Sequence, residues 1–176
     1  MQQLSEAALR VTLNLTIQPV EGRAKYRAPD MSLVYAPTTN SAETNASRSR
    51  SGAWLHTGSR VFVTTGFVTM TFEGSPLLFT SLDAYTNDQR WMDTAINVTP
   101  PRGSGALVLT DDRLDDQRLA LPAEPRFYVD RRQNTLRVCL EKLTSQRYFE
   151  IGSDLLAGLT GDRLTELVLL NVCFFE

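Results

Sequence analysis

One stretch of the chain decides its fold class: Arg60-Val61-Phe62-Val63-Thr64-Thr65-Gly66-Phe67-Val68-Thr69-Met70-Thr71-Phe72. Valine, threonine and phenylalanine dominate it, and such β-branched and aromatic side chains fit the pleated surface of a sheet. Gly66 predicts a bulge or bend inside the run. The turn residues 73–76 and the apolar segment 77–82 follow. We therefore predict a β-hairpin in this part of the chain.

Toward the N-terminus, the segment 9–17 alternates apolar residues at odd positions with polar residues at even positions. This period of two predicts a strand with one face in water. Residues 31–35 form the next short apolar group and are a candidate strand. The sequence from 23 to 60 shows no other strand signal.

Toward the C-terminus, segments 126–130 and 135–140 flank a turn and predict a second hairpin. Shorter strands are expected at 106–110 and 147–151. The apolar run Leu167–Phe175 predicts a central strand buried on both faces. A buried helix is the alternative, because periodicity cannot separate the two in a continuous apolar run.

Helix signals are few. Residues 86–97 carry the best one, since Thr86 or Asn87 could cap a helix there. Residues 153–159 are a candidate for one or two helical turns. With about six to nine short strands, the pattern predicts a mainly β fold, an antiparallel β-sandwich or a partly open barrel, in a single domain spanning 1–176.

Composition is that of a folded protein, with 42% hydrophobic and 22% charged residues. No apolar run approaches the roughly 18–20 residues that cross a bilayer. The first six residues lack the basic and apolar regions of a secretory signal. We therefore expect no membrane insertion and a cytoplasmic or virion location.

Residues 36–58 form a long loop or arm rich in serine, threonine, asparagine and arginine. Long loops without secondary structure are uncommon in compact domains and are usually functional. The candidate interaction residues are Arg48, Arg50 and Trp54 in this loop, with Arg131 and Arg132 at the tip of the second hairpin.

Charge is divided unevenly along the chain. Residues 1–60 hold 7 basic and 4 acidic side chains, a net +3, whereas residues 61–176 hold 11 and 16, a net −5. Such a division suits head-to-tail self-association, although ordinary proteins also show it by chance. The total of −2 and the isoelectric point of about 5.5 do not support a nucleic-acid footprint.

The sequence carries only weak signals for a catalytic or metal-binding motif. The acidic residues Asp111, Asp112, Asp115 and Asp116 fit an acidic turn, and a weak Ca²⁺ site is the alternative. His56 is the only histidine and has no G-x-S-x-G partner for a catalytic triad. We predict no catalytic residues, no cofactor and no other metal site.

The two cysteines, Cys139 and Cys173, lie in apolar stretches and are predicted to be buried thiols in a reducing compartment. A disulfide between them is the alternative if their strands are neighbours.

These observations favour a non-enzymatic structural or assembly protein that binds itself or another protein, with a virus or phage particle as one such assembly. One alternative is a monomeric β-sandwich module that binds carbohydrate near Trp54, with Trp91, Tyr26, Tyr35 and Tyr85 as further candidates for a sugar platform. The other is an inhibitor or immunity-type protein that presents loop 36–58 to a partner enzyme.

Overall fold

Strands dominate the computed structural model, which describes residues 8–38, 59–142 and 144–176. They make up 56% of the structure against 2% helix, and the sheet is not closed into a barrel. The predicted mainly β, sandwich-like fold is therefore confirmed. Within the described ranges, no helix has the length and apolar character needed to cross a membrane.

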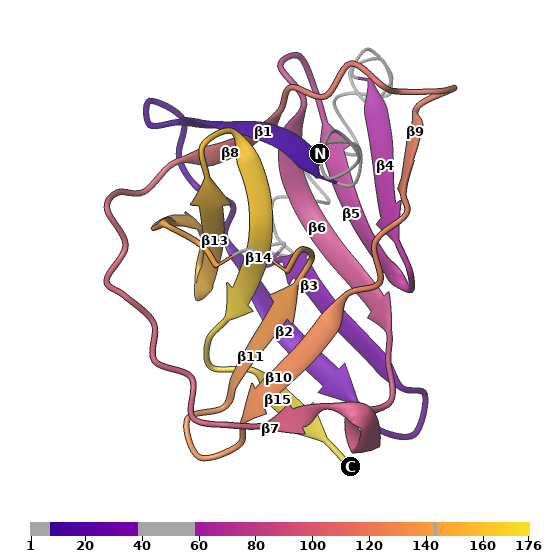
Figure 1. Cartoon of the computed structure of the whole chain (residues 1–176), viewed down its shortest axis with the longest axis vertical. Helices are drawn as coiled ribbons and strands as arrows, with labels where there is room; N and C mark the ends of the chain where they lie inside the picture. Colours follow the sequence, from indigo (N-terminus) through magenta and orange to yellow (C-terminus); the bar gives the residue numbers. More distant parts are fainter. Residues whose placement is uncertain (1–7, 39–58, 143) are drawn as a thin grey trace, which may run out of the picture.

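Two layers of strands face each other across the core (Figure 1). The β6 layer contains β2 (Gly22–Arg27), β3 (Ser32–Pro37), β4 (Arg60–Thr65), β5 (Val68–Glu73), β6 (Leu78–Tyr85), β8 (Ala106–Leu109), β9 (Arg118–Leu121) and β15 (Cys173–Phe175). The β14 layer contains β7 (Met92–Asp93), β10 (Arg126–Asp130), β11 (Thr135–Cys139), β12 (Arg147–Gly152), β13 (Leu155–Thr160) and β14 (Arg163–Leu169).

Strand β1 (Leu9–Asn14) joins the two layers. Its first two residues pair with β14, and its last four pair with β8. Most pairs are antiparallel, as predicted, but β15 runs parallel to β2, β9 to β4 and β7 to β10.

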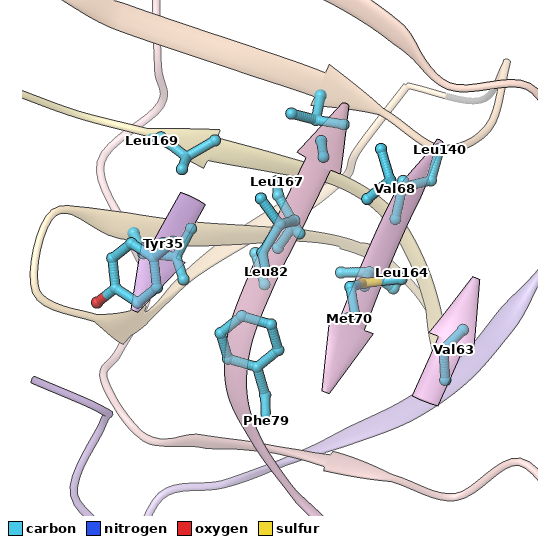
Figure 2. Packing of buried hydrophobic residues seen from close by; sticks show 14 of the residues in the cluster. Tyr35, Val63, Val68, Met70, Phe79, Leu82, Leu140, Leu164, Leu167 and Leu169 are labelled. Atoms are coloured by element: carbon cyan, nitrogen blue, oxygen red, sulfur yellow. The ribbon is translucent and has the colours of Figure 1, made fainter. Parts of the chain in front are cut away.

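The main hydrophobic core lies between the layers. Leu82 and Tyr35 of the β6 layer are fully buried against residues such as Leu167 of β14 (Figure 2). Every residue from Leu164 to Leu169 is buried, so the prediction of a central strand is correct for 167–169 but not for 173–175, which form the partly exposed edge strand β15. The apolar run nevertheless divides in two, because β14 ends at Leu169 and the chain then turns into β15.

Gly66 does not bend a continuous strand, as the sequence predicted, but forms the turn between β4 and β5. Its φ of +53° favours glycine, and a Cβ at this position would lie 2.8 Å from Cδ of Pro125. The stretch that decides the fold class is therefore itself a hairpin.

Both helix predictions are wrong. Residues 86–97 contain only the single 3₁₀ turn η1 (Asp88–Arg90), although Asn87 caps it as expected by accepting a hydrogen bond from the Gln89 N–H at 2.9 Å. Residues 153–159 enter β13, which pairs with strands on both sides. Backbone pairing across the sheet outweighs the weak local helix preference of these leucines and alanine.

Strand β2 is absent from the prediction for a simple reason. Only Ala24 and Tyr26 face the core, while Arg23, Lys25 and Arg27 face solvent. Two inward apolar residues are too few to reveal the alternation in the sequence.

The outer face of the β14 layer is covered by the connection between β7 and β8. Ile96 from this connection belongs to a second hydrophobic cluster with Tyr148, Leu156 and Val168. The connection is tied to β12 by the Arg102 N–H, which donates to the Tyr148 carbonyl at 2.8 Å.

Candidate functional site

An open hollow of about 730 Å³ lies beside the β4–β5 turn, the end of β6 and the start of β10. We call it the aromatic hollow. Phe67, Tyr85 and Met92 line it and are 76%, 57% and 42% exposed. Among the described residues, only Leu15 and Phe175 are other large hydrophobic side chains with such exposure. A gathering of exposed apolar side chains marks a binding surface.

Two buried or half-buried rings support the aromatic hollow from below. Trp91, 6% exposed, stacks on Phe127 with ring centroids 6.0 Å apart and an angle of 16° between the planes. The Trp91 Nε1–H donates to Oγ1 of Thr86 at 2.8 Å, which fixes the indole orientation. The floor is thus rigid, and it combines segments from both layers.

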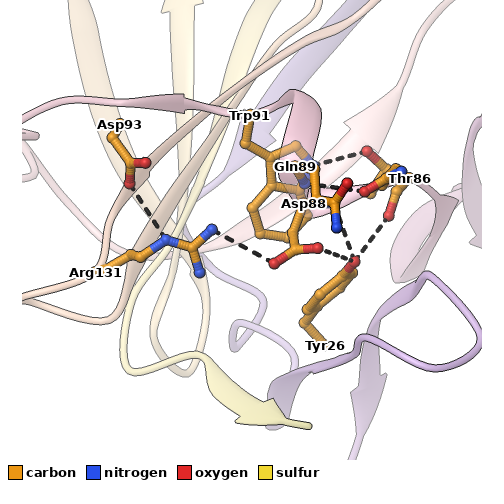
Figure 3. A network of polar contacts seen from close by, with 8 residues as sticks. Tyr26, Thr86, Asp88, Gln89, Trp91, Asp93 and Arg131 are labelled. Atoms are coloured by element: carbon orange, nitrogen blue, oxygen red, sulfur yellow. Dashed lines mark hydrogen bonds and ion pairs between the residues drawn. The ribbon is translucent and has the colours of Figure 1, made fainter.

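A polar network holds η1 in place next to this floor (Figure 3). The Tyr26 hydroxyl lies 3.1 Å from the Thr86 carbonyl and 3.2 Å from Oδ1 of Asp88, and it accepts the Asp88 N–H at 3.1 Å. Arg131 bridges Asp88 at 3.4 Å and Asp93 at 3.3 Å. Burial raises the pKa of Tyr26, so its phenol stays neutral and keeps its proton for this network.

Charged residues form the rim of the aromatic hollow: Arg90, Glu124 and Arg126. None of them is ion-paired with another residue in the part of the chain that the structure describes. Aromatic residues, methionine and arginine are the types enriched at protein interfaces. The lining therefore offers apolar contact and charge for recognition.

The structure describes two of the five predicted interaction residues, Arg131 and Arg132. Arg131 belongs to the network next to the floor, and Arg132 is exposed on the same turn. Arg48, Arg50 and Trp54, together with His56, lie outside the described residues, as does most of the predicted loop 36–58. Trp91 and Tyr85 were named among the candidate aromatics. Phe67, Met92 and Phe127 were missed, because nothing in their spacing indicates that they converge.

The acidic segment forms a turn. Asp111 is buried and binds Arg113, with Nε 2.7 Å from Oδ1 and Nη2 2.5 Å from Oδ2. These hydrogen bonds lower the pKa of Asp111 to about 2. Across residues 8–38, 59–142 and 144–176, no three His, Cys, Asp or Glu side chains are grouped to hold a metal. The Ca²⁺ alternative for Asp111, Asp112, Asp115 and Asp116 therefore has no ligand set.

Both cysteines are free and half-buried, so the disulfide alternative is not realised. Burial and the neighbouring Glu166 raise the pKa of Cys139 to about 11. Glu166 also accepts a hydrogen bond from the Tyr148 hydroxyl and lies 3.5 Å from Nε of Arg137. A thiol with this pKa is protonated at neutral pH, which makes it a poor nucleophile.

Comparison with known proteins gives no further guide. No protein-family description matches this chain, and no curated protein matches it either. The structure defines the class only as a mainly β, sandwich-like protein with an aromatic-lined hollow.

Proposed function

We propose that this protein is a non-enzymatic assembly protein that binds another protein, or a second copy of itself, through the aromatic hollow. One observation carries the proposal: three of the five exposed large hydrophobic side chains of the described residues, Phe67, Tyr85 and Met92, surround a single hollow. Isolated exposed hydrophobic residues need no explanation, but a clustered set does.

The energetics favour an interface. Full burial of a large apolar side chain stabilises a complex by roughly 1.5–3 kcal/mol. Interface hot spots are typically aromatic residues that lie in a desolvated centre surrounded by polar groups. Phe67 and Tyr85 provide such a centre, and Arg90, Glu124 and Arg126 provide the surrounding charges. A partner would insert apolar side chains into the hollow and pair with these charges at its edge.

Assembly within a virus or phage particle is one form of this function, and a complex with a partner enzyme is another. Carbohydrate binding is the competing function, because Tyr85 lies beside rim groups that could bind hydroxyls. Phe67 and Met92 argue for a protein partner, since neither side chain carries a hydrogen-bond donor or a strong acceptor for sugar hydroxyls.

The test compares three proteins by light scattering behind size exclusion over a range of concentrations: the intact chain, the double variant Phe67→Ser/Tyr85→Ser, and the control Leu15→Ser. Leu15 is 64% exposed and lines a different hollow, so its substitution removes a similar apolar surface elsewhere. In 500 mM NaCl, where contacts between exposed charges are screened, we expect at least tenfold weaker association in the double variant and no change in the control.

The same three proteins should be used to capture partners, followed by native mass measurement of each complex. A double variant that associates as strongly as the intact chain contradicts the proposal. Saturable binding of a glycan that the double variant loses, with no protein partner, supports the carbohydrate module instead.

A further inference from the structure

A row of three cations lies on the outer face of β2, away from the aromatic hollow. Arg23, Lys25 and Arg27 occupy alternate positions and are exposed, whereas the intervening Ala24 and Tyr26 are buried in the core. Alternate residues of a strand are about 6.8 Å apart, so the three charges follow a straight line. They line a shallow hollow of about 560 Å³. We call this row the basic strip.

No acidic residue faces the basic strip from β3. Across the antiparallel pair, Arg23 is opposite Ala36, Lys25 opposite Val34 and Arg27 opposite Ser32. The one ion pair that the structure describes for these cations joins Arg27 to Asp30 at 3.6 Å, with side chains 64% and 50% exposed. Such a solvated pair contributes little. Among the described residues, no carboxylate of β3 therefore offsets the three cations of the strip, and the nearest acidic residue across the sheet is Asp83 of β6, which pairs with Val34.

A rigid acidic turn lies elsewhere on the molecule. Asp112, Asp115 and Asp116 are exposed in the connection between β8 and β9. Backbone hydrogen bonds of 2.8 Å run in both directions between Asp115 and Arg118 and close the turn. Asp111 and Arg113 neutralise each other by their ion pair. The three exposed carboxylates are therefore held outward, and we call them the acidic turn.

The two features lie on separate parts of the molecule. Figure 1 shows the connection into β9 at the upper end of the long axis, whereas β2 runs down to the lower end, where it lies beside β15. The acidic turn therefore cannot reach the basic strip of its own chain. It can reach the strip of a neighbouring copy.

We propose that the basic strip binds the acidic turn of a second copy, so that copies associate head to tail. A contact between two different surfaces of the same protein leaves one of each free at the ends, and it extends into a ring or an open chain. This contact involves neither Phe67 nor Tyr85 and does not depend on the function proposed for the aromatic hollow.

A second copy fits the basic strip better than nucleic acid does. Three cations would neutralise about three phosphates, whereas proteins that bind nucleic acid by charge alone typically make about 6–10 such contacts. The whole chain carries a net charge of −2, which opposes a polyanion as large as DNA. Three carboxylates on one rigid turn match the number of cations in the strip.

The experiment uses charge reversal and complementation. One variant is Arg23→Glu/Lys25→Glu/Arg27→Glu. The other is Asp112→Lys/Asp115→Lys/Asp116→Asn, in which asparagine is chosen because φ at residue 116 is +42° and asparagine tolerates such values. The control, Arg102→Glu/Lys142→Glu, reverses charge at two exposed sites outside the strip and changes the net charge in the same direction as the strip variant. Circular dichroism and thermal unfolding check that each variant folds.

Sedimentation velocity at 20 mM and 500 mM NaCl gives the readout. We expect the intact chain and the control to associate more strongly at low salt than at high salt. Each charge-reversed variant alone should associate at least tenfold more weakly. An equimolar mixture of the two should associate again, because the glutamates of one meet the lysines of the other.

Three results would overturn the proposal: association of the strip variant equal to that of the intact chain, failure of the mixture to recover, or strip-dependent binding of a 20-nucleotide single strand without self-association. The variant Phe67→Ser separates the two interfaces. If it keeps the salt-dependent association, the strip contact stands whatever the aromatic hollow binds.

Discussion

Trp91 and Phe127 stack in a nearly parallel arrangement, 6.0 Å apart and 16° from coplanar, and this pair forms the floor of the aromatic hollow. Trp91 follows η1, and Phe127 lies in β10. The parallel pairing of Met92 with Tyr128 brings their segments together. Tyr26 of β2 packs against this pair, with its ring centroid 4.5 Å from that of Trp91. The hollow thus depends on contacts among three distant parts of the chain.

Replacing Trp91 with alanine should destabilise the protein by roughly 3–5 kcal/mol, because a buried aromatic side chain would leave a cavity. Trp91→Phe should cost less, since it keeps a ring on Phe127 and loses the 2.8 Å hydrogen bond to Thr86, a loss of about 1 kcal/mol. Urea unfolding of both variants measures the difference. A Trp91→Ala protein within about 1 kcal/mol of the intact chain would contradict the close packing of Trp91 on Phe127.

Asp111→Asn should lower stability at neutral pH by about 2 kcal/mol, because the ion pair with Arg113 lowers the pKa of this carboxyl from 3.8 in a free chain to about 2. A carboxyl whose pKa is lower in the folded protein than in the unfolded chain stabilises the folded protein at pH values above its unfolded-state pKa. That stability is lost as the pH falls from about 4 to about 2. The difference in urea midpoint between the intact chain and Asp111→Asn should therefore have its full size at pH 7 and should disappear near pH 2.

The control for this prediction is Asp112→Asn, the exposed neighbour. It should leave the urea midpoint unchanged at both pH values. A gap between the intact chain and Asp111→Asn that is independent of pH would show that the ion pair is not its cause.

Gly66→Ala should destabilise the protein more than Gly161→Ala. Both glycines have positive φ, +53° and +64°, so alanine is strained at either site by about 1 kcal/mol. A Cβ at 66 would also lie 2.8 Å from Cδ of Pro125, whereas a Cβ at 161 would have no neighbour within 4 Å. Thermal unfolding of the two variants isolates the steric contact, and equal losses would contradict it.

Cys139 should react slowly with iodoacetamide at pH 8 in the folded protein. Its pKa of about 11, against 9.0 for a free thiol, lowers the thiolate fraction by about 100-fold. The measurement is mass spectrometry of alkylation in a Cys173→Ser background, with the urea-unfolded protein as the reference. Glu166→Gln should speed the reaction, since Glu166 helps to raise this pKa. Equal rates in the folded and unfolded protein would contradict the burial of this thiol.

Local sequence was enough to predict the strand content and several strand positions. Alternation revealed β1, and the β-branched composition of 60–72 revealed strand there, although not its division into β4 and β5 at Gly66. The β10–β11 hairpin was also predicted correctly, because its turn and its flanking strands are neighbours in the chain. Periodicity and turn composition are local properties, so they can be read without knowing which segments meet.

Tertiary structure alone decided the rest. Residues 153–159 became a strand because β12 and β14 supply hydrogen-bonding partners on both sides. Phe67, Met92 and Phe127 gather around one hollow because the β4–β5 turn, β7 and β10 meet in space. Strand β2 is hidden in the sequence because its outward positions carry cations, and the same positions make the basic strip. Local sequence sets the conformation of each segment, but a binding surface depends on which segments the sheet brings together.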